Sequence, residues 1–398
     1  MPSRKRDHNS RHHIEASLPP SPTTSEWDKP HNTLFIETRT SATDESTESQ
    51  ALSTSTTDRE VLVPDMFTSI LSVEPVQNAH YAQVKLEADS WIAKTLGLND
   101  EQKSRHSRAD FAYLVSWWAP NCDAEALRTM VDWQNWAFVW DDQFDEGHLK
   151  EDLHAAACNI INMTSILDDC HPLVSRDDDP IAYACQLFNT DTKPVSRDPQ
   201  SAASPRYPLT DQDLKHYMLG VLGQVHSRRL DARSLTMEDF LVFRRGTIGV
   251  MPCTVLVEYA LGIEVPDHII SHPSIKACQE VAVDLVLLDN DILSYKKDVI
   301  EGEDLSVIGI LCSQGYTLQG AMDEAGRMID TRYRRWYEAL AQMPSWGSKQ
   351  DRVVLKYLGG LRDIALGSLL WSFWTGRYFN KHEGEMLRET RLLRLPIR

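Results

Sequence analysis

Apolar residues recur at intervals of three and four positions along most of the chain after Val61, for example through residues 127–138 and 275–286. This spacing places them on one face of an α-helix and predicts amphipathic helices. Alternating runs of β-branched residues, which would predict strands, are nearly absent, and no repeat of a helical solenoid is found. The pattern therefore predicts an all-α protein built as a single helical domain.

The first 60 residues differ in composition from the rest of the chain. They open with Arg4-Lys5-Arg6, continue through a proline-rich stretch, and end in a segment rich in Ser, Thr and Glu. Such a segment holds too little apolar surface to offset the entropy of ordering it, so residues 1–60 are expected to be a disordered tail. Residues 61–398 are expected to form one domain. Four prolines predict a loop over residues 189–208. The basic run of residues 388–398 could close over a site, but a solvated end is the simpler expectation.

Composition and charge narrow the classes of function. The chain of 398 residues has 58 acidic and 41 basic residues, a formal net charge of -17, which disfavours binding to the phosphate backbone of nucleic acids. No apolar run is long enough for a membrane span, and no apolar signal-peptide core is found. The seven cysteines form no C-x-x-C pair, which indicates reduced thiols and a cytoplasmic location.

An acidic group stands near the predicted end of one helix. Asp141 and Asp145 lie one turn apart on one helical face, with Asp142 beside them, and Gly147 is the expected stop. Two carboxylates about 5 Å apart repel each other by roughly 3 kcal/mol at an effective dielectric of 20. A hard divalent cation such as Mg²⁺ would remove that penalty, whereas a solvated acidic helix end is the simpler alternative.

A second polar stripe follows a strongly apolar helix that is expected to begin near Pro273. Asn290, Ser294 and Asp298 are spaced four residues apart, so their amide, hydroxyl and carboxylate oxygens project from one side. Buried polar groups need partners, and these three would find them in a metal ion or in a network of hydrogen bonds. Two oxygen-bearing faces in one helical domain favour a metal cluster between them.

The motifs D-D-x-x-D and N-D-x-x-S-x-x-x-D, roughly 150 residues apart, resemble those of class I terpene synthases of the fungal and bacterial single-domain type. The resemblance implies an α-helical bundle in which three Mg²⁺ ions hold an isoprenoid diphosphate. It makes Asp141 and Asp145 metal ligands on one side, with Asp142 as their neighbour, and Asn290, Ser294 and Asp298 ligands on the other. The family usually ends the second motif with Glu, so Asp298 has a slightly shorter reach.

Further residues match the family in order and spacing. The segment of residues 243–249 resembles its diphosphate-sensing element, which implies that Arg245 senses the diphosphate, Ile248 is the linker and Gly249 presents its carbonyl to the substrate at a helix break. Arg377-Tyr378 resembles a pair that hydrogen-bonds the diphosphate. Lys297 matches a lysine that contacts it in relatives.

The chemistry explains these residue types. A departing diphosphate needs its charge neutralised by metal ions and fixed arginines, and the carbocation left behind is stabilised by aromatic faces. Candidates for such a lining stand near the motifs: Phe111, Tyr113, Trp117, Trp118, Phe138, Trp140, Trp371 and Trp374.

The sequence thus predicts an Mg²⁺-dependent terpene cyclase acting on an isoprenyl diphosphate, with farnesyl diphosphate and a sesquiterpene product expected. A diterpene synthase using geranylgeranyl diphosphate and a prenyl chain-elongating synthase are alternatives, although Asn and Ser in the second motif favour cyclisation. The non-enzymatic alternative is a helical interaction protein with degenerate motifs. A D-x-D-D run of class II cyclases and an H-E-x-x-H pattern of metal-dependent hydrolases are both absent. The oligomeric state is left open.

Overall fold

The computed structural model describes residues 59–167, 171–191, 211–227, 235–303 and 305–396. All of the expected tail except Arg59 and Glu60 lies outside these residues. The elements in chain order are β1 (Arg59–Leu62), a 3-10 turn η1 (Ser69–Leu71), α1 (Tyr81–Leu96), α2 (Asp100–Ala109), α3 (Phe111–Trp118), α4 (Ala124–Asp145), α5 (Leu153–Ser165), α6 (Pro180–Asp191), α7 (Asp211–Ser227), α8 (Met237–Thr247), α9 (Val250–Leu261), α10 (Asp267–Ile270), α11 (Pro273–Leu293), α12 (Tyr295–Glu301), α13 (Val307–Ser313), α14 (Leu318–Ala341), α15 (Ser348–Trp374), α16 (Lys381–Thr390) and β2 (Leu392–Leu395).

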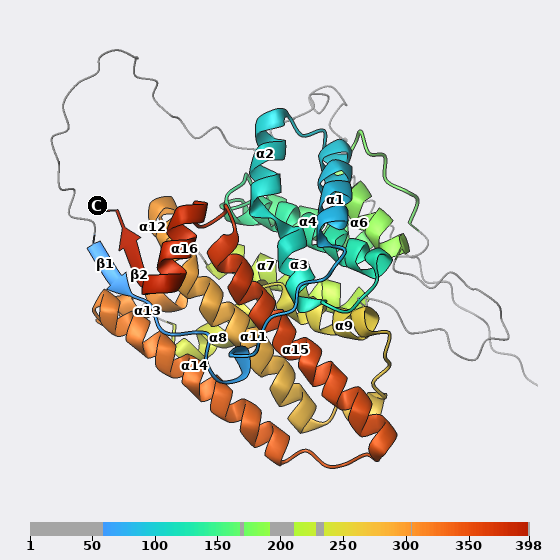
Figure 1. Cartoon of the computed structure of the whole chain (residues 1–398). Coiled ribbons are helices and arrows are strands. Elements are labelled where there is room, and N and C mark those ends of the chain that lie inside the picture. The colour runs from blue at the N-terminus through green and yellow to red at the C-terminus, as the bar shows by residue number, and fades with distance from the viewer. Residues whose placement is uncertain (1–58, 168–170, 192–210, 228–234, 304, 397–398) are drawn as a thin grey trace, which may run out of the picture. The chain divides into compact units, whose positions relative to one another are not determined.

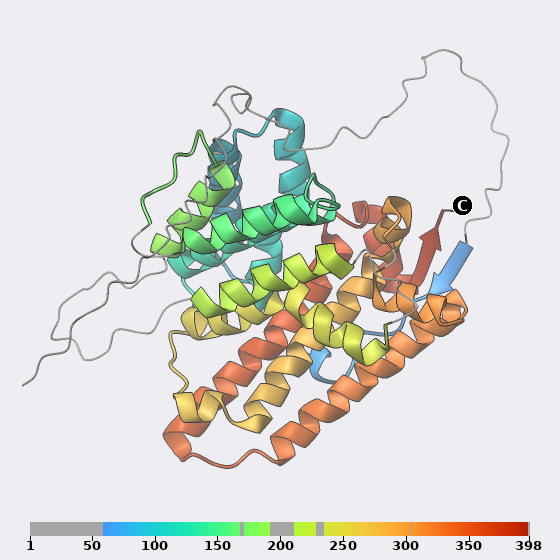
Figure 2. The same ribbon diagram turned by 180° about the vertical axis from the view of Figure 1, so that it is seen from behind.

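Helix α11 is the centre of the bundle, because its residues 281–289 are all buried. It packs against α14 and α15, which run beside it in Figure 1, and also against α8 and α9. Helices α5 and α7 pack against each other on the side of the bundle that Figure 2 shows in front. Helix α11 begins at Pro273, as predicted, because proline lacks the N–H that a first turn leaves unused. The predicted all-α bundle is confirmed.

Two short strands depart from the sequence prediction. β1 pairs with β2 in an antiparallel sheet, with Arg59 opposite Leu395 and Leu62 opposite Leu392. In β2, Leu393 and Leu395 are buried while their neighbours are exposed, so the expectation of a solvated C-terminal end is wrong for this stretch. Local periodicity could not reveal the pairing, because the partners lie at opposite ends of the chain.

The loop predicted for residues 189–208 begins later than expected. Helix α6 continues to Asp191, and the rest of the stretch from residue 192 lies outside the described residues.

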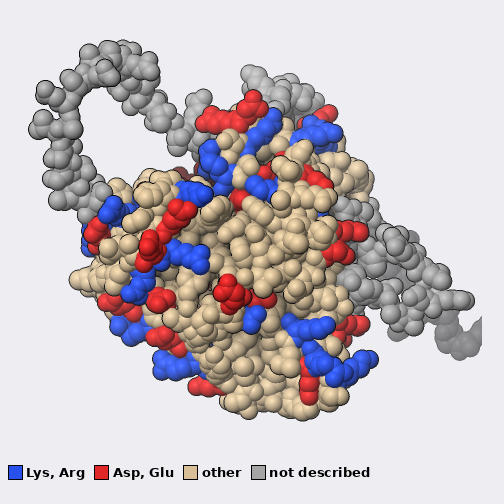
Figure 3. Space-filling view, in the orientation of Figure 1, with Lys and Arg blue, Asp and Glu red and all other residues tan. Residues whose placement is uncertain are grey.

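No single described helix is both long and apolar enough to cross a membrane. Helices α8 and α9, which meet at an angle of 49°, pass that test only as a bent pair and only on length and composition. On the face shown in Figure 3, basic and acidic side chains are interspersed, and no extended patch of one sign is seen.

Candidate active site

The first acidic motif lies where α4 ends. The backbone N–H groups of Glu146 and Gly147 both donate to the carbonyl of Asp142 at 2.9 Å, which closes the last turn. A Cβ on Gly147 would lie 2.7 Å from the backbone of Gln143, so only glycine fits this reversal. The chain therefore turns away directly after the acidic group, as the sequence predicted, and Asp141 and Asp145 are left at the helix end.

The break between α8 and α9 is found at Gly249. This residue has φ +70° and ψ 10°, in the left-handed region that favours glycine. Helix α9 starts at Val250, and Pro252 is tolerated in its first turn. The predicted break at Gly249 is therefore present, and residues on both sides of it reach the cavity described below.

The second polar stripe spans the junction of α11 and α12. The N–H of Ser294 donates to the carbonyl of Asn290 at 2.7 Å, and the N–H of Asp298 donates to the carbonyl of Ser294 at 3.0 Å. Helical hydrogen bonding thus continues across the junction and keeps the three side chains on one side. The hydroxyl of Ser294 donates to Oδ2 of Asp298 at 2.7 Å.

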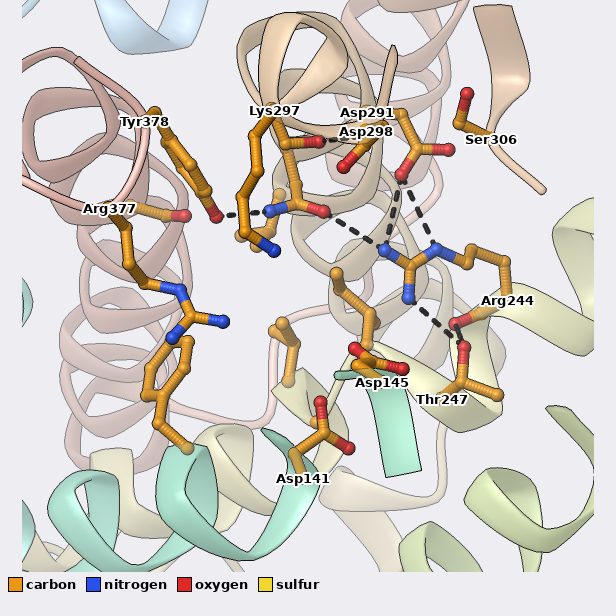
Figure 4. Close-up of a pocket in the computed structure, with 18 of the residues that line it drawn as sticks. Asp141, Asp145, Arg244, Thr247, Asp291, Lys297, Asp298, Ser306, Arg377 and Tyr378 are labelled. Carbon is orange, nitrogen blue, oxygen red and sulfur yellow. Dashed lines mark hydrogen bonds and ion pairs between the residues drawn. The ribbon is translucent and has the colours of Figure 1, made fainter. Parts of the chain in front are cut away.

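These elements enclose one cavity, shown in Figure 4 with Asp141 and Asp145 facing Asp298 across it. Most of the predicted site residues line it: Asp141, Asp145, Ile248, Gly249, Asn290, Ser294, Lys297, Asp298, Arg377 and Tyr378. Its apolar lining includes Trp118, Phe138 and Trp371 from the predicted aromatic set, together with Leu114, Phe243, Val250, Val286 and Ile364. The cavity is therefore polar and charged on some walls and apolar and aromatic on others.

Several expected residues are not in this lining. Of the predicted aromatic set, Phe111, Tyr113, Trp117, Trp140 and Trp374 are absent from it. Trp140 is fully buried, and its indole N–H donates to Asn159 at 3.0 Å. Asp142 does not line the cavity either, and instead forms an ion pair with Arg377 at 2.6 Å.

Arg245 also lies outside the cavity. Its Nε and Nη2 donate to the two carboxylate oxygens of buried Asp284 at 2.5 and 2.8 Å, and Arg332 of α14 contacts the same carboxylate at 2.9 Å. Consecutive helical residues point about 100° apart, so the two neighbouring arginines of α8 cannot face the same wall. The structure thus places Arg245, the residue expected as the diphosphate sensor, on a side of α8 that does not line the cavity.

The arginine of α8 that does reach the cavity is Arg244, which the sequence analysis did not single out. Its guanidinium donates to Oδ1 of Asn290 at 2.9 Å, to Oδ1 of Asp291 at 3.2 Å and to the hydroxyl of Thr247 at 3.1 Å. The sequence holds a partial signal, which suggests two partners for the two arginines but not which arginine meets which partner. Asp284 and Asp291 lie two turns apart on α11, and therefore offer adjacent arginines of α8 two separate partners.

Negative charge accumulates at the first motif. Burial raises the pKa of Asp141 well above its usual value, and the neighbouring Asp145 and Asp142 carboxylates raise it further. Burial also raises the pKa of Asp298 to about 7, although the hydrogen bond from Ser294 acts in the opposite direction. Asp141 and Asp298 are therefore harder to ionise in this site than in water.

Several basic side chains surround Glu146, which follows the first acidic motif. This carboxylate contacts Lys297 at 2.7 Å, Arg105 at 2.9 Å and Arg377 at 3.7 Å. Burial opposes its ionisation, but Lys297 and Arg377 outweigh that effect and lower the pKa of Glu146 to about 2. Burial likewise disfavours charged Arg377, yet Asp142 raises the pKa of this guanidinium well above its usual value. Both cations therefore stay charged at the cavity.

The donor chemistry fits a hard divalent cation. The predicted ligands supply carboxylate, amide and hydroxyl oxygens, which Mg²⁺ prefers, and a bound cation would stabilise the carboxylate form of Asp141 and so lower its raised pKa. Within the described part of the chain, no three His, Cys, Asp or Glu side chains converge closely enough to form one metal cluster.

Comparison with known proteins gives consistent matches. Residues 132–335 match the family described as terpene synthase family 2, C-terminal metal binding. The chain is 42% identical over 337 residues to a (+)-eremophilene synthase of Gibberella fujikuroi, covering 84% of this chain and 93% of that one. It is 40% identical over 347 residues to a (1R,4R,5S)-(-)-guaia-6,10(14)-diene synthase of Fusarium mangiferae, covering 84% and 85%. The crystal structure of germacradien-4-ol synthase from Streptomyces citricolor superposes with a TM-score of 0.63 at 19% identity, covering 77% of this chain and 99% of that one.

Proposed function

Because this chain belongs to the terpene synthase family, we propose that it is an Mg²⁺-dependent cyclase that converts farnesyl diphosphate to a sesquiterpene and releases diphosphate. The observation that carries the proposal is one cavity in which carboxylates, arginines and a lysine stand over apolar and aromatic walls. Such a cavity suits a ligand with a charged head and a hydrocarbon tail.

The charged residues would act on the diphosphate head. Asp141, Asp145, Asn290, Ser294 and Asp298 are the residues that would hold Mg²⁺, with three ions expected. When bound, the metal supplies Lewis-acid stabilisation of the leaving diphosphate. Arg244, Lys297, Arg377 and Tyr378 line the same cavity and present N–H and O–H donors to phosphate oxygens. Ionisation breaks the bond between the allylic carbon and oxygen, and the diphosphate leaves with the electron pair.

The apolar wall would control the carbocation. Trp118, Phe138 and Trp371 offer aromatic faces that attract positive charge by roughly 0.5–2 kcal/mol each and carry no nucleophile to trap it. The guanidinium of Arg377 lies 5.4 Å from the ring of Phe138, so the polar and aromatic walls meet at this residue. The hydrocarbon chain would fold against this wall, and loss of a proton from the final cation gives the neutral product.

Product analysis tests the proposal. Purified protein is incubated with the C10, C15 and C20 prenyl diphosphates, with and without Mg²⁺, and the volatiles are analysed. We expect a cyclic C15 hydrocarbon that depends on Mg²⁺.

The other outcomes separate the alternatives. A product from the C20 substrate alone would indicate a diterpene synthase, and a product that forms only when isopentenyl diphosphate is added would indicate chain elongation. No product from any substrate would contradict the enzymatic proposal and favour a helical interaction protein.

A further inference from the structure

Helix α7 carries two side chains that reach the paired aspartates of α4. The hydroxyl of Tyr217 donates to Oδ1 of Asp141 at 3.0 Å, and the amide of Gln224 donates to Oδ1 of Asp145 at 2.5 Å. Tyr217 and Gln224 are about two turns apart, so they lie on the same face of α7. Each aspartate therefore has its own donor from one neighbouring helix.

The ring of Tyr217 is held firmly in place. It is 4% exposed and packs edge-on against Trp140 of α4, with the ring centroids 5.6 Å apart. The ring also lies close to the helix break, because a Cβ on Gly249 would lie 3.3 Å from it. The hydroxyl is thus fixed between the first acidic motif and the junction of α8 and α9.

The backbone of α7 is equally constrained. Gly220 lies on this face between the two donors, and a Cβ there would clash with the carbonyl of Gly246 on α8. Helices α7 and α8 therefore approach each other at backbone contact distance. Donors mounted on such a helix have a defined position relative to the cavity.

We infer that Tyr217 and Gln224 are positioning residues for metal binding: each fixes one oxygen of an aspartate, so that the other oxygen is presented to a divalent cation. The inference rests on the proposed function, since it assigns cations to Asp141 and Asp145. Hydrogen bonds to ligating carboxylates set their orientation, and losing such a partner typically weakens metal affinity 10–100-fold. Neither residue belongs to either acidic motif.

A purely structural role would give a different result. If the two hydrogen bonds only stabilise buried carboxylates, removing a donor lowers the melting temperature and leaves the dependence on Mg²⁺ unchanged. The two roles are therefore separated by a binding measurement without turnover.

The experiment uses the full-length chain and inorganic pyrophosphate. Binding is followed by titration calorimetry and by the shift in melting temperature over a series of Mg²⁺ concentrations. For Tyr217→Phe we expect the Mg²⁺ midpoint to rise about tenfold. Gln224→Met, which keeps the length of the side chain and removes the donor, is expected to raise it in the same direction. This second variant keeps the test valid if the first folds poorly.

Tyr333→Phe is the matched control. Tyr333 is also buried, and its hydroxyl donates to the carbonyl of Met66 at 3.0 Å, away from the cavity. It is expected to lower the melting temperature of the free protein and to leave the Mg²⁺ midpoint unchanged.

Each contrary result has a distinct meaning. A wild-type chain that binds pyrophosphate without any dependence on Mg²⁺, or not at all, would contradict the proposed function. A wild-type chain that responds to Mg²⁺ while Tyr217→Phe and Gln224→Met show the same midpoint would overturn the inference alone. An equal shift in Tyr333→Phe would overturn it too, by tracing the effect to general stability.

Discussion

At the scale of single residues, the neighbouring arginines of α8 divide two tasks. Arg244 faces the cavity, where it contacts Asn290 and Asp291. Arg245 faces away and joins Arg332 on the buried carboxylate of Asp284, which ties α8 to α11 and α14. The first arginine is therefore placed to act on a ligand, and the second to hold the helix that carries it.

Lysine substitutions should separate these tasks. Lys keeps the charge but loses the planar fork of donors that binds phosphate and carboxylate bidentately. For Arg244→Lys we expect kcat to fall about 100-fold, comparable with the loss of one transition-state donor. For Arg245→Lys we expect turnover close to that of wild type and a loss of about 1–3 kcal/mol in unfolding free energy. Steady-state kinetics and urea denaturation measure both. A larger fall of kcat in Arg245→Lys than in Arg244→Lys would indicate that Arg245 is the residue that contacts diphosphate.

A buried histidine makes the stability of the protein depend on pH. Burial lowers the pKa of His106, whose ring nitrogen shares a hydrogen bond with Asn135 at 3.1 Å. In the unfolded chain this histidine takes up a proton as the pH drops below about 6.5, whereas in the folded protein it stays neutral to lower pH. The unfolding free energy is therefore unaffected by His106 above pH 6.5 and decreases as the pH drops below that value.

Urea denaturation between pH 5 and 8 checks this expectation. The variant His106→Gln lacks the titrating group, so the unfolding free energy of the variant should decline less than that of wild type below pH 6.5. Parallel pH profiles for the two proteins would show that His106 is not responsible for the decline.

At the scale of elements, the site depends on how helices end and how closely they approach. Helix α4 ends at Asp145 and the chain reverses at Gly147, α8 and α9 are separated at Gly249, and α7 touches α8 where Gly220 meets Gly246. Gly147 and Gly220 leave no room for a Cβ, and Gly249 needs the backbone freedom of glycine. Bringing the motifs to one cavity thus depends on glycines as much as on the acidic residues.

Two alanine substitutions test this point. Gly220→Ala must separate α7 from α8, so we expect a loss of about 1–3 kcal/mol in stability and a weaker response to Mg²⁺ and pyrophosphate. Gly359→Ala is the control: it lies within α15 with no atom within 4 Å of the added Cβ, and it should gain about 0.5–1 kcal/mol by reducing the entropy of the unfolded chain. Thermal unfolding of both variants gives the comparison. A Gly220→Ala protein as stable as Gly359→Ala would contradict the close approach.

The sequence could predict the helices, because periodicity is a local property, and it could predict many of the charged residues of the cavity, because they match the motifs of a known family. It anticipated the break at Gly249 and the start of α11 at Pro273, both of which follow from backbone chemistry. It could not tell Arg244 from Arg245, because which arginine faces the cavity depends on the rotation of α8 against α11. Tyr217 was missed for the same reason: its partner Asp141 lies on another helix, and no short motif links them.

At the scale of the whole molecule, the two ends of the described chain are joined. Beyond the pairing of β1 with β2, the N–H of Val63 donates to the carbonyl of Arg391 at 2.9 Å, and the guanidinium of Arg388 lies 4.8 Å from the ring of Phe67. The segment before α1 is thereby anchored to the segment after α16, through contacts that do not involve the cavity.

Truncation should reveal how much the contacts between the two ends contribute to stability. A chain ending at Arg391 loses β2 and the burial of Leu393 and Leu395, and we expect its unfolding free energy to fall by about 2–4 kcal/mol. A chain ending at Leu395 keeps both leucines and is expected to match the full chain. Guanidinium denaturation measures the difference. Equal stability of the two truncated chains would mean that β2 contributes little.

The antiparallel register of β1 and β2 has a practical consequence for protein engineering. Arg59 and Leu395 stand opposite each other like the two arms of a hairpin that lacks its turn. A two-residue Asn-Gly linker is a natural turn for such a pair. A circularly permuted gene could therefore join Leu395 to Arg59 through this linker and open at the exposed Pro344 between α14 and α15. The new termini would then lie away from the substrate cavity, where a fusion partner or surface tether could be attached.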